Sequence, residues 1–386
     1  MQVLFVTPSY FPIVGGSEVL TQVLSSKLNE AGIHSDIMTL NMNKKWNPIW
    51  REETATDNSA SVFREPAINP LPRLPNPLFS LLKTNVVPKP SFTKKFRDYD
   101  IVHFVGEADL SFPLFSFFYR MPKLFQCVGI FRKGGIYKYY TVERPYLRKI
   151  FSKVFIHLAD KFIISSQEEQ DLLVDLGVPE WKTIVLPIGV DTMLFRPNPA
   201  LRIENMILFV GRIDRIKGLH ILLEALRFLE HPVRLDVIGP AFDAEYMREV
   251  EKKSAAINNS GFHRVELLGS KNSADLVPWY QKAAVLVCPY AYETHSNVVR
   301  ESLACGTPVV STGSHILENC SDGISIARQN PKDLADAINS LLEKPEVCGR
   351  LGKQGRETIE RYFSWDAIIT ELTKLYEDTQ SLYKNR

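Results

Sequence analysis

Short apolar runs alternate along this chain with longer segments in which apolar residues recur every three or four positions. The longer segments predict helices with one buried face, as in GRIDRIKGLHILLEAL, where the leucines make one stripe. The short runs predict strands that are buried on both faces, at 3–6, 35–40, 101–105, 206–210, 233–238, 265–268 and 285–288. Because strands and helices alternate, the pattern predicts an α/β protein.

The stretch from 284 to 312 carries the most local information. Its apolar run stops at Pro289, which has no amide hydrogen to donate to a sheet, and a second run follows at 308–311. Helical spacing fills the interval, so the order is strand, loop, helix and strand. This βαβ unit places its loop at the carboxyl end of a strand, where open α/β sheets bind ligands.

The start of the helix in this unit suits an anion. Ser296 and Asn297 provide capping side chains, Val298 follows them, and Gly306 ends the helix. The first amides of a helix have no partner within it, and the helix dipole is positive there. A diphosphate is therefore a fitting ligand at this position.

Two carboxylates frame the same corner. Glu293 lies in the loop and Glu301 lies about one turn into the helix, so both can reach one ligand. The alternative is that each is a solvated surface residue, the usual fate of a glutamate.

A second candidate feature follows the strand at 206–210. Arg212 and Lys217 stand in the turn between that strand and the next helix. Two cations at a strand-to-helix turn can stabilise a diphosphate that gathers charge as it leaves. The strand at 233–238 ends at Gly239, so the loop there is a further candidate for ligand contact at the carboxyl edge of the sheet.

Near the amino terminus, Gly15 and Gly16 precede a helix, where glycine lets the backbone approach a ligand closely or simply forms a turn. His103 lies within a predicted strand and is either a core residue or part of a site. Glu107 is an alternative polar group just beyond that strand.

Length and composition limit the class of protein. A chain of 386 residues exceeds the roughly 250–300 at which one core stops growing, so we expect two domains. A net charge of +2 argues against nucleic acid as the main partner. Five scattered cysteines with no CxxC pair, and a start without a charged leader, indicate a cytoplasmic protein.

Two regions are less regular. Prolines interrupt 41–98, which predicts loops and at most one short helix. The segment 112–153 is rich in aromatic and basic residues, which suits an anionic membrane surface or a phosphorylated acceptor. The alternative is an aromatic core beside a solvated basic helix.

Several of these segments together resemble one family. The Glu-x7-Glu spacing continues into ESLACGTPVV, residues 211–218 read GRIDRIKG, and 184–199 read IVLPIGVDTMLFRPNP. This set resembles the retaining glycosyltransferases of family 4. The resemblance implies a GT-B architecture, with two Rossmann-like domains that face each other across a cleft.

The resemblance also implies roles for residues and limits for domains. Arg212 and Lys217 would hold the donor diphosphate, Glu301 the ribose hydroxyls, and Glu293 would lie near the donor sugar. The Gly15–Gly16 loop would cover the diphosphate. The family's His-x-His has only its first histidine here, His103, because Val105 occupies the second place. The implied domains are 1–195 and 203–364, with a terminal helix at 365–386 that returns to the first.

The implied activity is transfer of a sugar, with retention, from a UDP- or GDP-sugar to the hydroxyl of a glycan or lipid-linked acceptor, in cell-surface glycan or glycolipid synthesis. No cofactor and no metal are expected, since no Asp-x-Asp motif stands in a suitable loop. The protein would be cytoplasmic, with peripheral contact at the inner face of the membrane. Alternatives are a nucleotide-sugar epimerase of the same fold and a non-catalytic nucleotide-sugar-binding protein.

Overall fold

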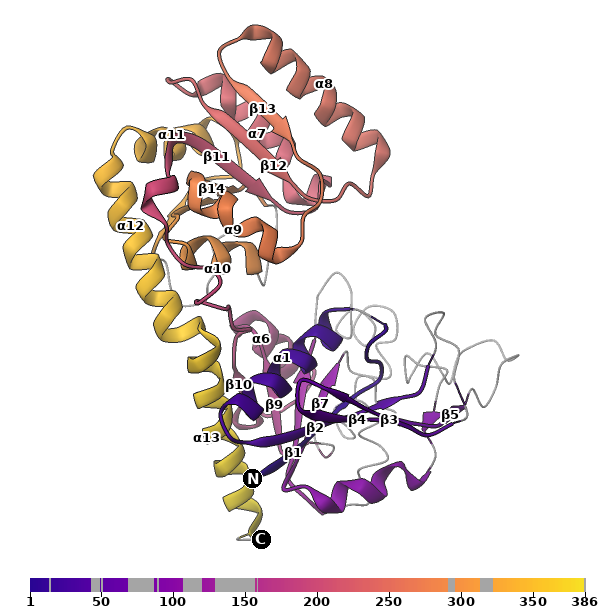
Figure 1. Ribbon diagram of the computed structural model, residues 1–386. Coiled ribbons are helices and arrows are strands. Elements are labelled where there is room, and N and C mark those ends of the chain that lie inside the picture. The colour runs from indigo at the N-terminus through magenta and orange to yellow at the C-terminus, as the bar shows by residue number, and fades with distance from the viewer. Residues whose placement is uncertain are drawn as a thin grey trace. The chain divides into compact units, whose positions relative to one another are not determined.

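The computed structural model describes residues 1–13, 15–42, 49, 51–68, 87–88, 90–106, 120–128, 157, 159–290, 296–312 and 322–384. The chain forms two compact units, Met1–Pro187 with Ile368–Arg386, and Ile188–Ala367 (Figure 1). The boundary between the implied domains, at 195–203, falls inside the second unit. Of the terminal helix α13 (Trp365–Lys384), the part from Ile368 onward belongs to the first unit.

The first unit is built on an eight-stranded sheet with the order β10-β9-β8-β7-β1-β2-β4-β3. Every neighbouring pair is parallel except β3 and β4. The strands are β1 (Gln2–Thr7), β2 (His34–Leu40), β3 (Glu53–Asp57), β4 (Ala60–Glu65), β7 (Ile101–Gly106), β8 (Lys123–Cys127), β9 (Lys161–Ile164) and β10 (Thr183–Val185). The helices that accompany them, besides α13, are α1 (Gly16–Glu30), the 3₁₀ helices η1 (Pro90–Asp98) and η4 (Glu180–Lys182), and α6 (Gln167–Asp175).

The expectation that 41–98 holds only loops and at most one short helix is wrong for the strands, although η1 is a short helix in that range. Strands β3 and β4 form a hairpin there, and β5 (Ala67–Ile68) pairs with β6 (Val87–Pro88). Asn58 and Ser59 make the turn with φ of 45° and 69°, the positive values that a two-residue hairpin turn requires. β4 pairs in parallel with β2 and so extends the sheet, and its residues Ala60 and Val62 are buried.

His103 lies in the core of the first unit. It sits on β7 with no exposed surface, its ring centroid is 5.0 Å from that of Phe5, and Nδ1 is 2.7 Å from the hydroxyl oxygen of Tyr376 on α13. Burial lowers the pKa of His103 to about 3, and a contact with Gln126 opposes this shift. These are the surroundings of a core residue, and the proposed site does not include His103.

The second unit contains a six-stranded parallel sheet with the order β13-β12-β11-β14-β15-β16. Its strands are β11 (Ile203–Val210), β12 (Arg234–Ile238), β13 (Arg264–Leu267), β14 (Ala283–Cys288), β15 (Val309–Ser311) and β16 (Ile324–Ile326). The helices are η5 (Pro199–Leu201), η6 (Arg215–Lys217), α7 (Leu219–Ala225), η7 (Leu226–Phe228), α8 (Ala244–Ser260), α9 (Ser273–Lys282), α10 (Asn297–Ala304), α11 (Pro331–Leu342), α12 (Pro345–Thr358) and the π-helix η8 (Ile359–Phe363).

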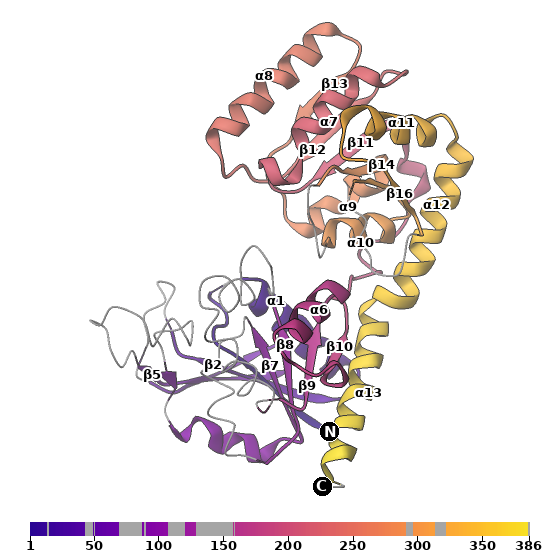
Figure 2. The same cartoon turned by 180° about the vertical axis from the view of Figure 1, so that it is seen from behind.

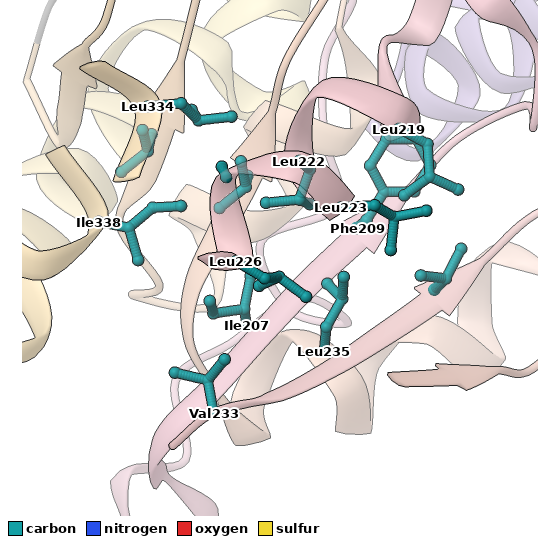
Figure 3. Close-up of a cluster of buried hydrophobic side chains, with 14 of the residues drawn as sticks. Ile207, Phe209, Leu219, Leu222, Leu223, Leu226, Val233, Leu235, Leu334 and Ile338 are labelled. Carbon is teal, nitrogen blue, oxygen red and sulfur yellow. The ribbon is translucent and has the colours of Figure 1, made fainter. Parts of the chain in front are cut away.

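Both faces of this sheet are buried, which explains the unbroken apolar runs. On β11, Ile207 and Phe209 point to one face, where they pack with Leu222 of α7 and Ile338 of α11 (Figure 3). Leu208 and Val210 point to the other face and belong to the cluster that includes α9 and α10. α12 lies beside α10 and α11 (Figure 2).

Among the described residues, no helix combines the length and the apolar character that crossing a bilayer requires.

Replacing His103 by Gln should make the free energy of unfolding fall less steeply as the pH is lowered. The folded ring stays neutral down to about pH 3, whereas the unfolded ring takes up a proton below its ordinary pKa of 6.5. The stabilisation is therefore complete above pH 6.5 and is lost as the pH falls, by about 1.4 kcal/mol per pH unit. Urea unfolding at neutral pH and at about pH 5 measures this slope. The exposed His231→Gln is the control, and an unchanged slope in His103→Gln would contradict the assignment.

Candidate functional site

The second unit has a topological switch point between β11 and β14. The chain runs outward from β11 through β12 to β13, then returns to the other side of β11 as β14. The loops that leave β11 and β14 therefore diverge from adjacent strand ends. In open α/β sheets this edge is where ligands bind.

A glycine follows each of three strands at this edge. Gly211, Gly239 and Gly269 follow β11, β12 and β13, with φ of 155°, 153° and 67°. A Cβ on Gly239 would lie 1.8 Å from the carbonyl oxygen of Gly211. The edge is thus built from closely packed backbone, and no side chain at Gly239 could be accommodated.

The loop after β11 presents two cations. Asp214 organises it: Oδ1 accepts a hydrogen bond from the backbone N–H of Lys217 at 3.0 Å, and Oδ2 lies 3.2 Å from Nε of Arg212. The Arg212 side chain remains 53% exposed. A carboxylate thus orients the guanidinium while leaving it accessible to a ligand.

The loops after β11 and β14 touch through their backbones. Gly218 has a φ of 70°, and a Cβ there would lie 1.9 Å from the carbonyl oxygen of Pro289. Nζ of Lys217 lies 4.3 Å from the centroid of the Tyr290 ring, a cation–π distance. The basic turn and the start of the β14 loop are therefore neighbours.

Helix α10 begins beyond the β14 loop. The Ser296 hydroxyl caps it by accepting from the backbone N–H of Val299, and the Asn297 Oδ1 accepts from the guanidinium of Arg300 at 2.6 Å. Asn297 and Val298 form its first turn. The predicted cap is confirmed at Ser296.

Glu301 accepts two hydrogen bonds from α9. Ser273 donates to Oε1 at 3.1 Å, and the Tyr280 hydroxyl donates to Oε2 at 2.7 Å. Burial raises the pKa of Glu301, while the bonds from Tyr280 and Ser273 act in the opposite direction. Ser273 begins the helix that follows β13, so the carboxylate faces the same sheet edge as the basic turn.

The structure thus brings Arg212, Lys217, Gly239, the start of α10 and Glu301 to one edge of one sheet. Sequence reasoning missed Asp214, Ser273 and Tyr280, which position these residues. Asp214 had a readable signal, since an aspartate three residues before Lys217 can cap a turn. Nothing in the spacing pointed to the two α9 hydroxyls.

Other predicted residues lie elsewhere. Glu293 and Glu107 fall outside the described residues. Gly15 caps α1 in the first unit with extended backbone, and a Cβ on Gly16 would meet no atom within 4 Å. The described residues contain no cluster of three or more His, Cys, Asp or Glu that could hold a metal ion.

Comparison with known proteins places this arrangement in a family. Residues 14–194 match Glycosyltransferase Family 4, and residues 204–344 match Glycosyl transferases group 1. The chain belongs to glycosyltransferase family 4, as its motifs indicated.

Individual glycosyltransferases are also similar to this chain in sequence. The D-inositol 3-phosphate glycosyltransferase of Corynebacterium jeikeium is 29% identical over 258 residues, which cover 61% of each chain. The first curated relatives are matched over only 55–61% of their length, less than two thirds.

Solved structures agree in fold over nearly the whole chain. Sucrose-phosphate synthase from Thermosynechococcus elongatus superposes with a TM-score of 0.69 at 23% identity, covering 99% of this chain and all of that one. Anabaena HepE in complex with UDP-glucose superposes with a TM-score of 0.68 at 16% identity, covering 98% of this chain and 100% of HepE. The predicted GT-B fold is confirmed.

Replacing Gly218 by Ala should destabilise the protein more than the same change at Gly261. The two glycines have φ of 70° and 74°, so both substitutions carry the same backbone strain, about 1–2 kcal/mol. An added Cβ meets nothing within 4 Å at Gly261, whereas at Gly218 it collides with Pro289. We expect a total loss of about 3 kcal/mol or more for Gly218→Ala, by denaturant unfolding. Equal losses would show that the loops do not touch as described.

Proposed function

We propose that this protein is a retaining glycosyltransferase that moves a sugar from a nucleoside diphosphate sugar to an acceptor hydroxyl. The observation that carries the proposal is the convergence of a basic turn and a partly buried, hydrogen-bonded glutamate at the switch point of the second unit. Family membership supports the reaction class.

The diphosphate would bind between the basic turn and the start of α10. The Arg212 guanidinium is exposed and already oriented by Asp214, and Lys217 stands beside Tyr290. The first amides of α10 add donors whose hydrogens have no partner within the helix. These groups stabilise the negative charge that the diphosphate gains when the glycosidic bond breaks.

The nucleoside would lie toward α9. Glu301 is held by two hydroxyls and retains oxygen lone pairs that can accept from the ribose hydroxyls. Next to Ser273, a surface pocket of about 570 Å³ is lined by Lys271, Asn272 and Trp279. An aromatic ring with amide and ammonium groups beside it suits a nucleobase.

The reaction needs no protein nucleophile. The bond between the anomeric carbon and the diphosphate oxygen breaks, and the acceptor oxygen bonds to that carbon on the same face. The acceptor proton passes to an oxygen of the leaving diphosphate. The protein's part is to orient the donor and to stabilise the charge that develops, and no metal is required for this scheme.

We propose UDP-sugars as the first donors to test, with GDP-sugars as the comparison. HepE, which shares the fold, was crystallised with UDP-glucose. For the acceptor we propose a glycan or lipid-linked hydroxyl, reached by a cytoplasmic protein that contacts the inner face of the membrane. The basic and aromatic composition of 112–153 supports this, although most of that segment lies outside the described residues. Within it, Phe125 and Lys123 are buried in the sheet as part of β8.

Arg212→Ala and Lys217→Ala should each lower turnover by about 10²- to 10³-fold, because each removes a donor to the leaving diphosphate. Release of nucleotide from the sugar donor in the presence of acceptor measures this rate. The matched control is Arg264→Ala: Arg264 pairs with Glu266 at the amino-terminal start of β13, at the opposite edge of the sheet. Wild-type turnover in both site variants would refute the assignment. An isomerised sugar nucleotide without nucleotide release would indicate an epimerase instead.

Donor affinity should fall as the pH is lowered, and Glu301→Gln should remove much of this dependence. Burial raises the pKa of Glu301, so the carboxylate takes up a proton at a higher pH than an exposed glutamate does. The protonated form has lost acceptor capacity toward the ribose hydroxyls. Calorimetric titration of the nucleotide between neutral and mildly acidic pH tests this. A wild-type affinity that follows the same pH profile as Glu301→Gln would contradict it.

A further inference from the structure

The second unit contains another cavity, of about 590 Å³, at the opposite edge of its sheet. Arg202 precedes β11, Ala284 lies near the start of β14, and Gly306 follows α10. Cys348 and Gly349 line the cavity from α12. Because β11 has eight residues, about 26 Å separates this edge from the basic turn. The cavity is therefore independent of the proposed donor site.

The walls of this cavity are mostly apolar. Pro197 and Pro199 contribute from the segment before β11, and Leu341 and Leu342 from the end of α11. The volume falls within the range of pockets that hold small organic ligands. An apolar body of that size would be removed from water on binding, which is favourable in proportion to the area buried.

One wall carries a positive charge without a carboxylate partner. The Arg202 guanidinium donates to the carbonyl oxygens of Ala283 at 2.8 Å, Ala284 at 3.4 Å and Gly306 at 3.0 Å. Among the described residues, no Asp or Glu oxygen lies within 4.0 Å of it. The other guanidinium at this cavity, Arg356, lies 2.6 Å from Glu360.

This difference indicates what the ligand carries. Arg202 is partly buried, and a partly buried charge that lacks a counter-ion favours an anion beside it. A guanidinium has five N–H donors, so hydrogens remain after its bonds to the carbonyl oxygens. Three glutamates also line the cavity, Glu204, Glu357 and Glu360, and all three are exposed to solvent. Glu357 and Glu360 lie beside Lys353 and Arg356, so they do not neutralise Arg202.

We propose that this cavity binds a small molecule with an apolar chain and one anionic end, with the anion received by Arg202. An alkyl carboxylate and an alkyl phosphate both meet this description. The proposal does not depend on sugar transfer, so the failure of either hypothesis leaves the other standing.

The test uses decanoate and decyl phosphate as probes, with decanol as the uncharged comparison, on the 386-residue chain. Two readouts are followed: the midpoint of thermal unfolding, and the rate at which iodoacetamide modifies Cys348, resolved from the other cysteines by peptide mass spectrometry. A bound chain should cover the thiol and slow its alkylation. One charge-assisted hydrogen bond is worth about tenfold or more in affinity, so we expect an anionic probe to bind at least tenfold more tightly than decanol. The better of the two anions identifies the headgroup.

Two substitutions at one position separate binding in the cavity from binding elsewhere. A Cβ on Gly349 meets no atom within 4 Å, so both Gly349→Ala and Gly349→Phe fit the backbone, but only Phe fills the cavity. We expect Gly349→Ala to keep the thermal shift and the protection of Cys348, and Gly349→Phe to lose both. Arg202→Gln should remove the preference for the anion over decanol.

Three results would overturn the proposal. They are no shift and no protection with either anion, the same response in Gly349→Phe as in Gly349→Ala, and equal affinity for decanol and the anions.

Discussion

The candidate site depends on a backbone contact between two loops. The turn after β11 and the loop after β14 meet where Gly218 lies against the carbonyl oxygen of Pro289. Only glycine fits there, because its φ of 70° is strained for other residues and a Cβ would collide. This contact holds Lys217 over Tyr290 and sets the basic turn beside the loop that leads to α10. Without this contact, nothing described here would hold the basic turn next to the loop that leads to α10.

The electrostatics of the site follow from the same packing. Asp214 binds both the backbone N–H of Lys217 and the guanidinium of Arg212, so the basic turn is arranged before any ligand arrives. At the other end, Ser273 and Tyr280 donate hydrogen bonds that orient the partly buried carboxylate of Glu301. Burial raises the pKa of Glu301, so its charged form is costly there. Groups arranged in advance lose little freedom on binding, and they act most strongly on charge that develops during a reaction.

Much of this could be predicted from the sequence. Strands such as β11 and β14 are buried on both faces and stand out as apolar runs, and the motif residues of the turn and of α10 could be read directly. Helix α8 was missed because only Tyr246, Val250 and Ser254 are buried among its polar residues. The hairpin of β3 and β4 was missed because β3 (ETATD) is polar and mostly exposed, so it forms no apolar run, and because prolines flank the two strands.

The partners of the site residues could not be predicted for a different reason. Ser273 and Tyr280 reach Glu301 across the space between two helices, and no local pattern encodes such a contact. His103 shows the converse. A motif suggested a place in the site, but the ring packs against Phe5 and Tyr376, which are far from it in sequence. The surroundings of both Glu301 and His103 are set by contacts between residues that are far apart in the sequence.

In the proposed site, the basic turn holds a diphosphate while Glu301 holds the nucleoside beside it. Calorimetric titration of UDP and of uridine into Lys217→Ala and Glu301→Gln tests this most directly. We expect Lys217→Ala to weaken the binding of UDP but not of uridine, and Glu301→Gln to weaken the binding of both. UDP affinity that is unchanged in Lys217→Ala, or uridine affinity that is unchanged in Glu301→Gln, would contradict it.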